Sequence, residues 1–196
     1  MFNTGKSKRL IFDDLFEDID RGKAGELVEI PFTNLPLLSY ELCGMTKGRY
    51  DLIGAETSVG KTAFVDDTYV LCPLEWINRN SSKKIDIEYV YITLEISAKR
   101  KLAKWIARDI FKKGGGMYND ISLNLILSRG KYKISDDLYK LARESREWFE
   151  YVESKITFVD SLTASSPEKI EQILKKKALD NGTFYKQKEF KREFKR

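Results

Sequence analysis

The chain has 196 residues, a formal net charge of +5 and 42% hydrophobic residues. This length and composition suit one globular domain with a sizeable core, and exclude a chain that is disordered throughout. No apolar run approaches the roughly 18 residues of a membrane span, and no secretory signal is visible.

The titratable residues exclude several kinds of site. The chain has no histidine, so catalysis by a Ser-His or Cys-His pair is excluded. Its two cysteines, Cys43 and Cys72, are widely separated, so a zinc site is not expected. Two lone thiols suit a reducing compartment, and we expect a cytoplasmic protein without a membrane partner.

The amino-terminal segment, residues 1–27, is charged and mixed in composition. Within it, Leu10-Ile11-Phe12, Leu15-Phe16 and Ile19 are spaced for a short amphipathic helix that ends near Gly22. This segment is interpreted as an arm or linker that packs on a neighbouring subunit. A terminal helix that covers its own domain is the alternative.

A phosphate-binding loop is the most specific motif in the chain. Residues 54–62 read GAETSVGKT, which follows the pattern G-x-x-x-x-G-K-[ST] with Ala55 at the usual first glycine. We expect a strand over Tyr50–Gly54 before it and a helix over Lys61–Cys72 after it. Pro73 is expected to kink or end that helix.

The chemistry of such a loop comes from its backbone and from two side chains. Unpaired N–H groups at a helix start attract anions, and successive N–H groups form a concave nest around a phosphate. Lys61 would reach the β- and γ-phosphates, and the Thr62 hydroxyl would ligate Mg²⁺. The nucleotide-binding residues predicted in this way are Thr57, Ser58, Val59, Gly60, Lys61, Thr62 and Ala63.

Further along the chain, strands and helices alternate. Residues 78–84 are polar and predict a loop, and residues 85–96 are rich in β-branched and aromatic side chains, which predicts a buried strand. Ser97 is a candidate N-cap for a helix that ends at Lys112-Lys113, before three glycines.

The last part of the chain continues this alternation. A short helix is expected near residues 120–128, a longer one from Ser135-Asp136 through Trp148, a strand over Ile156–Asp160 and a final helix opened by Ser166-Pro167-Glu168. Alternating strands and helices predict an α/β fold with a mainly parallel sheet flanked by helices.

The order of these motifs resembles the ATPase domain of replicative DNA helicases of the DnaB type, which has a RecA-like P-loop fold. The resemblance covers residues 28–178. It rests on the P-loop, on the lead-in segments 30–33 and 48–52, and on Thr93-Leu94-Glu95-Ile96-Ser97, which is similar to that family's Ser-Leu-Glu-Met. We expect a partial RecA-like domain over residues 28–180, incomplete on its carboxyl-terminal side, and a basic tail over residues 181–196.

The resemblance implies roles for particular residues and partners. Glu95 would polarise the water that attacks the γ-phosphate, so Glu95 and Lys61 are the candidate catalytic residues. ATP and Mg²⁺ would be bound, subunits would form a homo-oligomeric ring, and single-stranded DNA would be bound largely through regions outside this chain. A surface glutamate beside the helix start at Ser97 is the alternative for Glu95.

The family's distal strand with its Mg²⁺-binding aspartate, its DNA-contacting loops and its arginine finger have no counterpart in the sequence. Asp160, at the end of an apolar run, either supplies the missing carboxylate or caps the turn that follows it. A recombinase-like or other RecA-type ATPase, and a truncated module that binds nucleotide without turnover, therefore stay open as alternatives.

Two groups of basic residues are candidates for contact with nucleic acid. Lys99-Arg100-Lys101 and Lys104 lie on a predicted helix, where a solvated face is the alternative. Residues 184–196 hold six Lys or Arg and two Glu, interspersed with aromatic residues that would stack on bases. A solvated terminus is the alternative for this tail.

Overall fold

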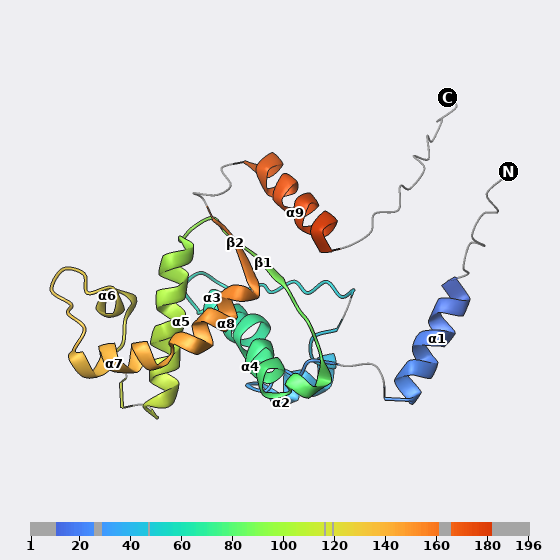
Figure 1. The fold of residues 1–196 in the computed structure, drawn as a ribbon, viewed down its shortest axis with the longest axis horizontal. Coiled ribbons are helices and arrows are strands. Elements are labelled where there is room, and N and C mark those ends of the chain that lie inside the picture. The colour runs from blue at the N-terminus through green and yellow to red at the C-terminus, as the bar shows by residue number, and fades with distance from the viewer. Residues whose placement is uncertain are drawn as a thin grey trace. The chain divides into compact units, whose positions relative to one another are not determined.

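Figure 1 draws the fold of the computed structural model. The structure describes residues 11–25, 29–46, 48–115, 117–118, 120–160 and 166–181. In chain order the helices and strands are α1 (Ile11–Lys23), α2 (Pro36–Leu42), α3 (Lys61–Val65), the π-helix η1 (Asp66–Leu71), α4 (Cys72–Arg79), the 3₁₀-helix η2 (Ser81–Lys83), β1 (Tyr89–Thr93), α5 (Ala98–Lys113), α6 (Leu123–Ile126), α7 (Asp136–Glu144), α8 (Arg146–Ser154), β2 (Ile156–Asp160) and α9 (Pro167–Asn181). These elements fall into two units, Met1–Asp86 and Ile87–Arg196, and each is described by itself.

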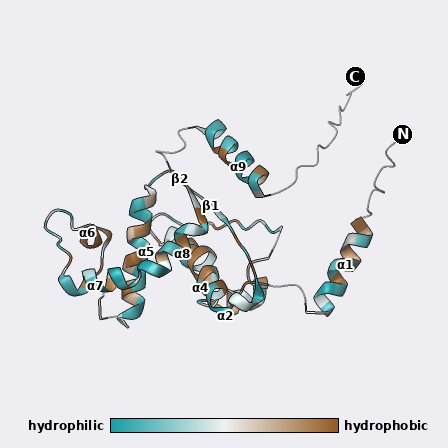
Figure 2. Ribbon diagram, in the orientation of Figure 1, coloured by the Kyte–Doolittle hydropathy of each residue, from teal (hydrophilic) through white to brown (hydrophobic). Residues whose placement is uncertain are grey.

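The predicted amino-terminal helix is present as α1, which ends one residue beyond Gly22. Figure 2 shows hydrophobic residues along this helix, interspersed with hydrophilic ones. Phe12 and Phe16 stack with their ring centroids 4.6 Å apart. The large apolar side chains are nonetheless exposed, from 44% for Ile19 to 88% for Ile11, so α1 does not cover the core of its own unit.

The expected strand over Tyr50–Gly54 is wrong. Residues 50–56 lie outside any strand, and Tyr50 and Leu52 are 85% and 84% exposed. A strand needs a neighbour to bond its backbone groups. Among the described residues of the first unit, the one strand-like pairing outside this stretch is an isolated antiparallel bridge between Ile30 and Met45.

Helical structure continues further after the P-loop than the sequence indicates. Pro73 does not end it, because the chain widens into the π-helix η1 and resumes as α4 with Pro73 in the first turn. A proline ring clashes with the carbonyl four residues earlier, and the wider π-turn is one way to relieve that clash. The predicted loop over residues 78–84 is therefore shortened by α4 and η2.

The core of the first unit is formed where the segment before the P-loop packs on η1 and α4. Phe32 and Leu74 are fully buried, and the Phe32 ring lies 4.8 Å from the Tyr69 ring, centroid to centroid. The Thr33 hydroxyl and the Cys72 thiol are 2.7 Å apart, which ties the same two segments together.

The second unit contains a two-stranded parallel sheet, in which β1 pairs with β2 from Tyr89↔Ile156 to Thr93↔Asp160. The predicted strand over Ile156–Asp160 is confirmed at both ends, whereas the one predicted over residues 85–96 is shorter. The fold is therefore mixed helix and strand with a small parallel sheet. A full RecA-like core remains a prediction.

Aromatic packing joins this sheet to α5. The rings of Tyr91, Trp105 and Phe158 contact one another with centroids 5.7–5.8 Å apart, and Trp105 is 2% exposed. Lys101 is 1% exposed and its ammonium lies 5.0 Å from the Tyr91 ring centroid. A buried ammonium needs such a partner, because burial in an apolar surrounding disfavours charge.

The helix expected from Ser135 through Trp148 is divided at Ser145 into α7 and α8. The helix starts where the sequence predicted, and Ser135 caps α7, since its hydroxyl accepts the Leu138 N–H. Ser145 is 1% exposed, and its hydroxyl donates to Asp109 on α5. The two residues are 36 positions apart in the chain, so local sequence signals do not reveal their contact.

Candidate nucleotide-binding site

The predicted phosphate-binding loop forms a tight turn directly before α3. Ser58 and Gly60 both have left-handed backbone conformations, with φ of 65° and 92°. Such conformations, alternating along a short segment, turn successive N–H groups toward one point. A Cβ added to Gly60 would meet nothing within 4 Å, so the space beside the loop is open to a ligand.

The helix start adds further donors. The first intrahelical hydrogen bond of α3 runs from the Phe64 N–H to the Gly60 carbonyl at 2.9 Å. The N–H groups of Lys61, Thr62 and Ala63 precede it and have no acceptor within the helix. Both the Lys61 and Thr62 side chains are exposed. The loop could thus hold an anion on backbone donors, with an ammonium and a hydroxyl beside it.

A polar contact joins the lead-in segment to the helix after the P-loop. The Asn34 amide donates to the Asp67 carboxylate at 2.8 Å and to the Thr68 hydroxyl at 3.1 Å. Thr68 is fully buried. This contact fixes the direction in which the helix leaves the P-loop, and it was not predicted because its partners are 33 and 34 residues apart.

Glu95 lies in the second unit, two residues beyond β1, and is exposed. The turn that carries it is closed by the Thr93 hydroxyl, which donates to the Ile96 carbonyl at 3.2 Å. Strand ends of this kind are where α/β folds place ligands. The P-loop residues belong to the first unit and Glu95 belongs to the second.

Asp160 caps α5. Its carboxylate accepts the Ala98 N–H at 3.1 Å, and Asp160 is 4% exposed. Ser97, the predicted N-cap, makes no side-chain capping bond. The cap is therefore supplied by the end of β2, a residue 62 positions away. Among the described residues no three acidic, cysteine or histidine side chains gather as a metal site.

The basic cluster at the start of α5 is not a continuous solvated face. Lys99 and Lys104 are exposed, Arg100 is half-buried, and Lys101 is buried against the Tyr91 ring. Only part of the cluster is thus available to a polyanion. The predicted basic tail lies outside the described residues, apart from Asn181 at the end of α9.

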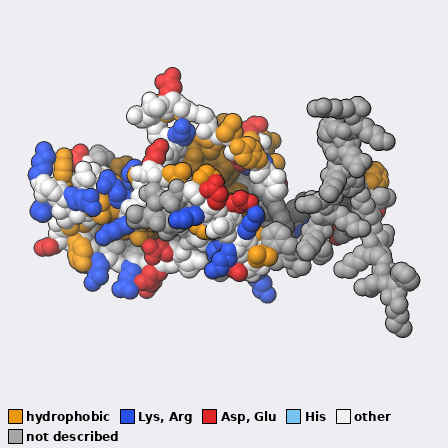
Figure 3. All heavy atoms as spheres, turned by 90° about the horizontal axis from the view of Figure 1, so that it is seen from above, with side chains coloured by type: hydrophobic (Ala, Val, Ile, Leu, Met, Phe, Trp, Pro, Cys, Tyr) orange, Lys and Arg blue, Asp and Glu red, His pale blue; other side chains and the backbone are white. Residues whose placement is uncertain are grey.

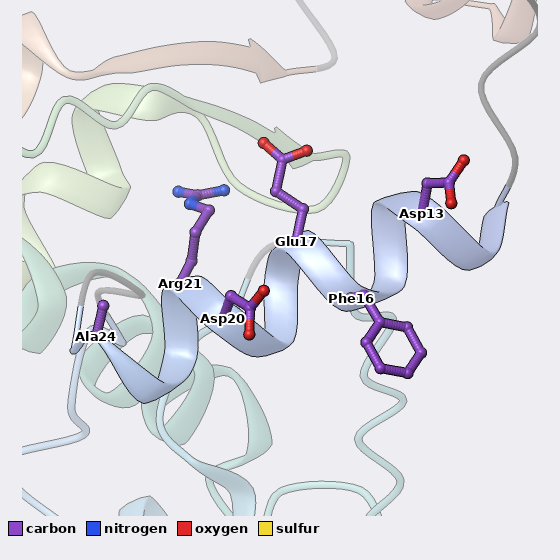
Figure 4. Close-up of a pocket in the computed structure, with 6 residues that line it drawn as sticks. All are labelled: Asp13, Phe16, Glu17, Asp20, Arg21 and Ala24. Carbon is purple, nitrogen blue, oxygen red and sulfur yellow. The ribbon is translucent and has the colours of Figure 1, made fainter.

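A hollow of about 560 Å³ runs along α1, and Figure 4 draws its lining. In this view Glu17 and Arg21 point to one side of the helix and Phe16 to the other. Five of the six lining residues belong to α1 and the sixth, Ala24, directly follows it, so no second helix or strand encloses a ligand there. We assign no site to it.

Comparison of the chain with protein families, with curated proteins and with solved structures finds no match. The described helices include none that is both long and apolar enough to cross a membrane. The candidate site therefore rests on the chain's own residues and on the resemblance of its motifs.

Proposed function

We propose that this chain is an ATP-binding, ATP-hydrolysing domain of a replicative-type DNA helicase that acts on single-stranded DNA. The observation that carries the proposal is the turn at Ser58 and Gly60, which leads into a helix that starts with Lys61 and Thr62. Backbone N–H groups and the Lys61 ammonium would bind the β- and γ-phosphates. Mg²⁺, held by the Thr62 hydroxyl and phosphate oxygens, would neutralise part of the phosphate charge.

Glu95 would act as the residue that orients and polarises the attacking water. Glu95 is exposed and lies two residues beyond the end of β1, which supports that role. The chain supplies no histidine that could do so instead. This part of the proposal depends on the resemblance more than the phosphate site does.

Subunits would assemble into a homo-oligomeric ring, as the resemblance implies. The exposed apolar side chains of α1 support a contact with a neighbouring subunit, because a row of such side chains in water is costly. Sedimentation of the chain with and without ATP tests assembly. A monomer under both conditions would contradict this part of the proposal.

Nucleotide binding by the Lys61→Ala variant tests the phosphate site. We expect the variant to lose tight binding of a fluorescent ATP analogue, because it lacks the ammonium that faces the phosphates. Lys84→Ala is the matched control, since Lys84 is an exposed lysine of the same unit and the change in charge is identical. Equal affinity of the two variants would contradict the assignment.

Magnesium-dependent hydrolysis, measured with and without single-stranded DNA, separates the alternatives. Turnover that DNA stimulates supports a motor domain. Strand exchange without unwinding would point to a recombinase-like ATPase instead. Tight ATP binding without turnover in any condition would point to a nucleotide-binding module.

A further inference from the structure

The second unit has a hollow between α5 and the segment that follows it. Its volume is about 340 Å³, within the range of small-ligand sites. Its lining includes Lys104, Arg108 and Phe111 from α5, and Tyr118, Ile121 and Leu123 from the following segment. None of the residues that line it belongs to the first unit, which contains the P-loop.

The α5 wall of this hollow is basic. Lys104, Arg108 and Phe111 are spaced three and four residues apart, which places them on one face of the helix. Among the described residues that line the hollow, none is acidic. The helix as a whole has seven Lys or Arg and one acidic residue, Asp109, so its local field favours an anion.

The hollow also presents two aromatic rings. The Phe111 ring is 46% exposed, which leaves a large apolar surface in water. Tyr118 packs against the backbone of Gly114, where an added Cβ would come within 2.4 Å of the tyrosine ring. The absence of a side chain at Gly114 therefore lets the Tyr118 ring lie close to the end of α5.

In Figure 3, Lys and Arg side chains are interspersed with hydrophobic side chains on part of the surface. Interspersed cations and exposed aromatic rings are the surface that single-stranded nucleic acid prefers, because its phosphates need neutralising and its bases stack. A simple inorganic anion would leave the exposed Phe111 ring without a role. A purely apolar ligand would not match the basic α5 wall of the hollow.

We propose that this hollow binds one nucleotide unit of single-stranded nucleic acid. The base lies against Phe111 and Tyr118, and the phosphate lies near Lys104 and Arg108. The inference deepens the proposed function, because it assigns a site within this chain to the DNA partner. It rests on that function only for the identity of the partner, since no residue of the P-loop takes part.

Binding of the full chain to a fluorescently labelled oligothymidine of about 15 nucleotides, without ATP, tests this assignment. We expect Phe111→Ala to weaken binding about tenfold through loss of base stacking. Lys104→Gln and Arg108→Gln should each weaken the salt dependence, so that the magnitude of the slope of log affinity against log salt concentration falls by about 0.7. The basic tail is present in every variant, so its contribution cancels.

Two control variants make the test specific. Lys99→Gln removes the same charge from an exposed position on the same helix but outside the hollow, and Phe12→Ala removes an exposed phenylalanine from α1. Both should bind within about twofold of the parent chain, since surface changes away from a site have small effects. Circular dichroism of each variant checks that the fold is retained.

Three results would overturn the inference: no binding of the parent chain to the oligonucleotide, unchanged affinity of Phe111→Ala, or equal effects of Lys99→Gln and Lys104→Gln. Displacement by thymidine monophosphate at the concentration at which the oligonucleotide binds would also overturn it, because the site would then prefer a free nucleotide. If the hollow does not bind DNA but ATP binding is intact, only the nucleic-acid site is rejected and the phosphate site is retained. If Lys61→Ala binds ATP normally but the hollow binds DNA, only the phosphate site is rejected.

Discussion

The Asp160 carboxylate accepts the Ala98 N–H at 3.1 Å, so the last residue of β2 caps the first turn of α5. In the parallel pairing of β1 and β2, Asp160 lies opposite Thr93, the last residue of β1. A buried carboxylate at a helix start is stabilised by the unpaired N–H groups and by the helix dipole. This arrangement gives Asp160 a capping role at the start of α5; the turn after β2, which the sequence indicated as the capped segment, lies outside the described residues, and a metal role for Asp160 stays a prediction.

Asp160→Ala is expected to lower the free energy of unfolding by about 1–2 kcal/mol, the usual cost of a lost helix cap. Asp160→Asn should cost less, because the amide oxygen can still accept the Ala98 N–H. Urea denaturation measures both, with Asp137→Ala at an exposed first-turn position of α7 as the control. Loss of magnesium-dependent hydrolysis in Asp160→Asn without loss of stability would instead favour a metal role.

Ser145→Ala is expected to lower the free energy of unfolding by about 1–3 kcal/mol. The Ser145 hydroxyl donates to Asp109 at 2.5 Å and accepts from the Lys113 ammonium at 2.7 Å, and these two charges lie 2.8 Å apart. Removing the hydroxyl leaves the largely buried Asp109 carboxylate with one hydrogen-bond partner fewer. Thermal denaturation measures the effect.

The control for that variant is Ser154→Ala at the end of α8, where the hydroxyl bonds the Tyr151 carbonyl at an exposed position. Its cost should be within about 0.5 kcal/mol, as is usual for exposed sites. If the two serine variants were equally stable, the contact between Ser145 and Asp109 would contribute nothing to the fold.

Gly44→Ala should destabilise the first unit more than Gly48→Ala does. Both glycines have positive φ, 63° and 78°, where a side chain costs roughly 1–2 kcal/mol. At Gly44 an added Cβ would also come within 2.4 Å of the Ile30 carbonyl oxygen, whereas at Gly48 it would meet nothing within 4 Å. Urea midpoints of the two variants give the comparison, and equal midpoints would contradict the close approach.

Stability should fall at alkaline pH because of Tyr89. Burial, followed by the nearby Tyr151, raises the pKa of the Tyr89 phenol above its ordinary value. Below about pH 10 the phenol is protonated in both states and contributes no pH dependence. Above about pH 10 it ionises in the unfolded chain first, so the unfolded state binds fewer protons and the free energy of unfolding decreases with pH.

Tyr89→Phe should reduce this alkaline loss, and unfolding in urea at about pH 9 and about pH 11 measures it. Tyr40→Phe, at a tyrosine that is 81% exposed, is the control. An identical alkaline loss in Tyr89→Phe and in the parent chain would show that other groups cause it. Tyr69, whose pKa is also raised by burial and by Asp51, is the next one to replace.

Under the proposed function, Glu95→Gln should separate binding from turnover. ATP affinity should stay unchanged, because the phosphates are held by the loop of the first unit, while hydrolysis should fall by about 10²- to 10⁴-fold with the loss of the general base. Glu88→Gln, a change of the same type before β1, is the control, although Glu88 also pairs with Lys177 on α9 at 2.8 Å. Unchanged hydrolysis in Glu95→Gln would exclude it as the water-activating residue.

Local signals in the sequence were sufficient for much of the secondary structure. Ser135 caps α7, Gly114 follows the last residue of α5, Pro167 is the first residue of α9, and the apolar run before Asp160 is β2. The helix boundaries among these depend on a side chain and its near neighbours in the chain, whereas β2 also needs β1 as its partner. The turn that leads from the P-loop into α3 belongs to the same class, since Gly60 permits the left-handed conformation at its own position.

The failures share a different cause. The apolar residues of 50–54 predicted a strand, but strand formation requires a partner, and none pairs with them among the described residues of the first unit. The alternative prediction for the basic cluster was a solvated face, but Lys101 is buried and its ammonium packs over the Tyr91 ring. The helix predicted to continue through Trp148 is divided at Ser145, whose hydroxyl donates a hydrogen bond to Asp109, 36 positions earlier.

The sequence by itself therefore determined the boundaries of several helices and the donor groups of the phosphate-binding loop, because interactions between near neighbours decide these features. It also predicted the residues of β2 through their apolar, β-branched character. Only the tertiary structure decided which acidic residue caps α5, which lysine is buried, and that cations and aromatic rings meet in the hollow beside α5. The cap joins residues 62 positions apart, and the other two features depend on how α5 packs against the segments on either side of it, which no local pattern specifies.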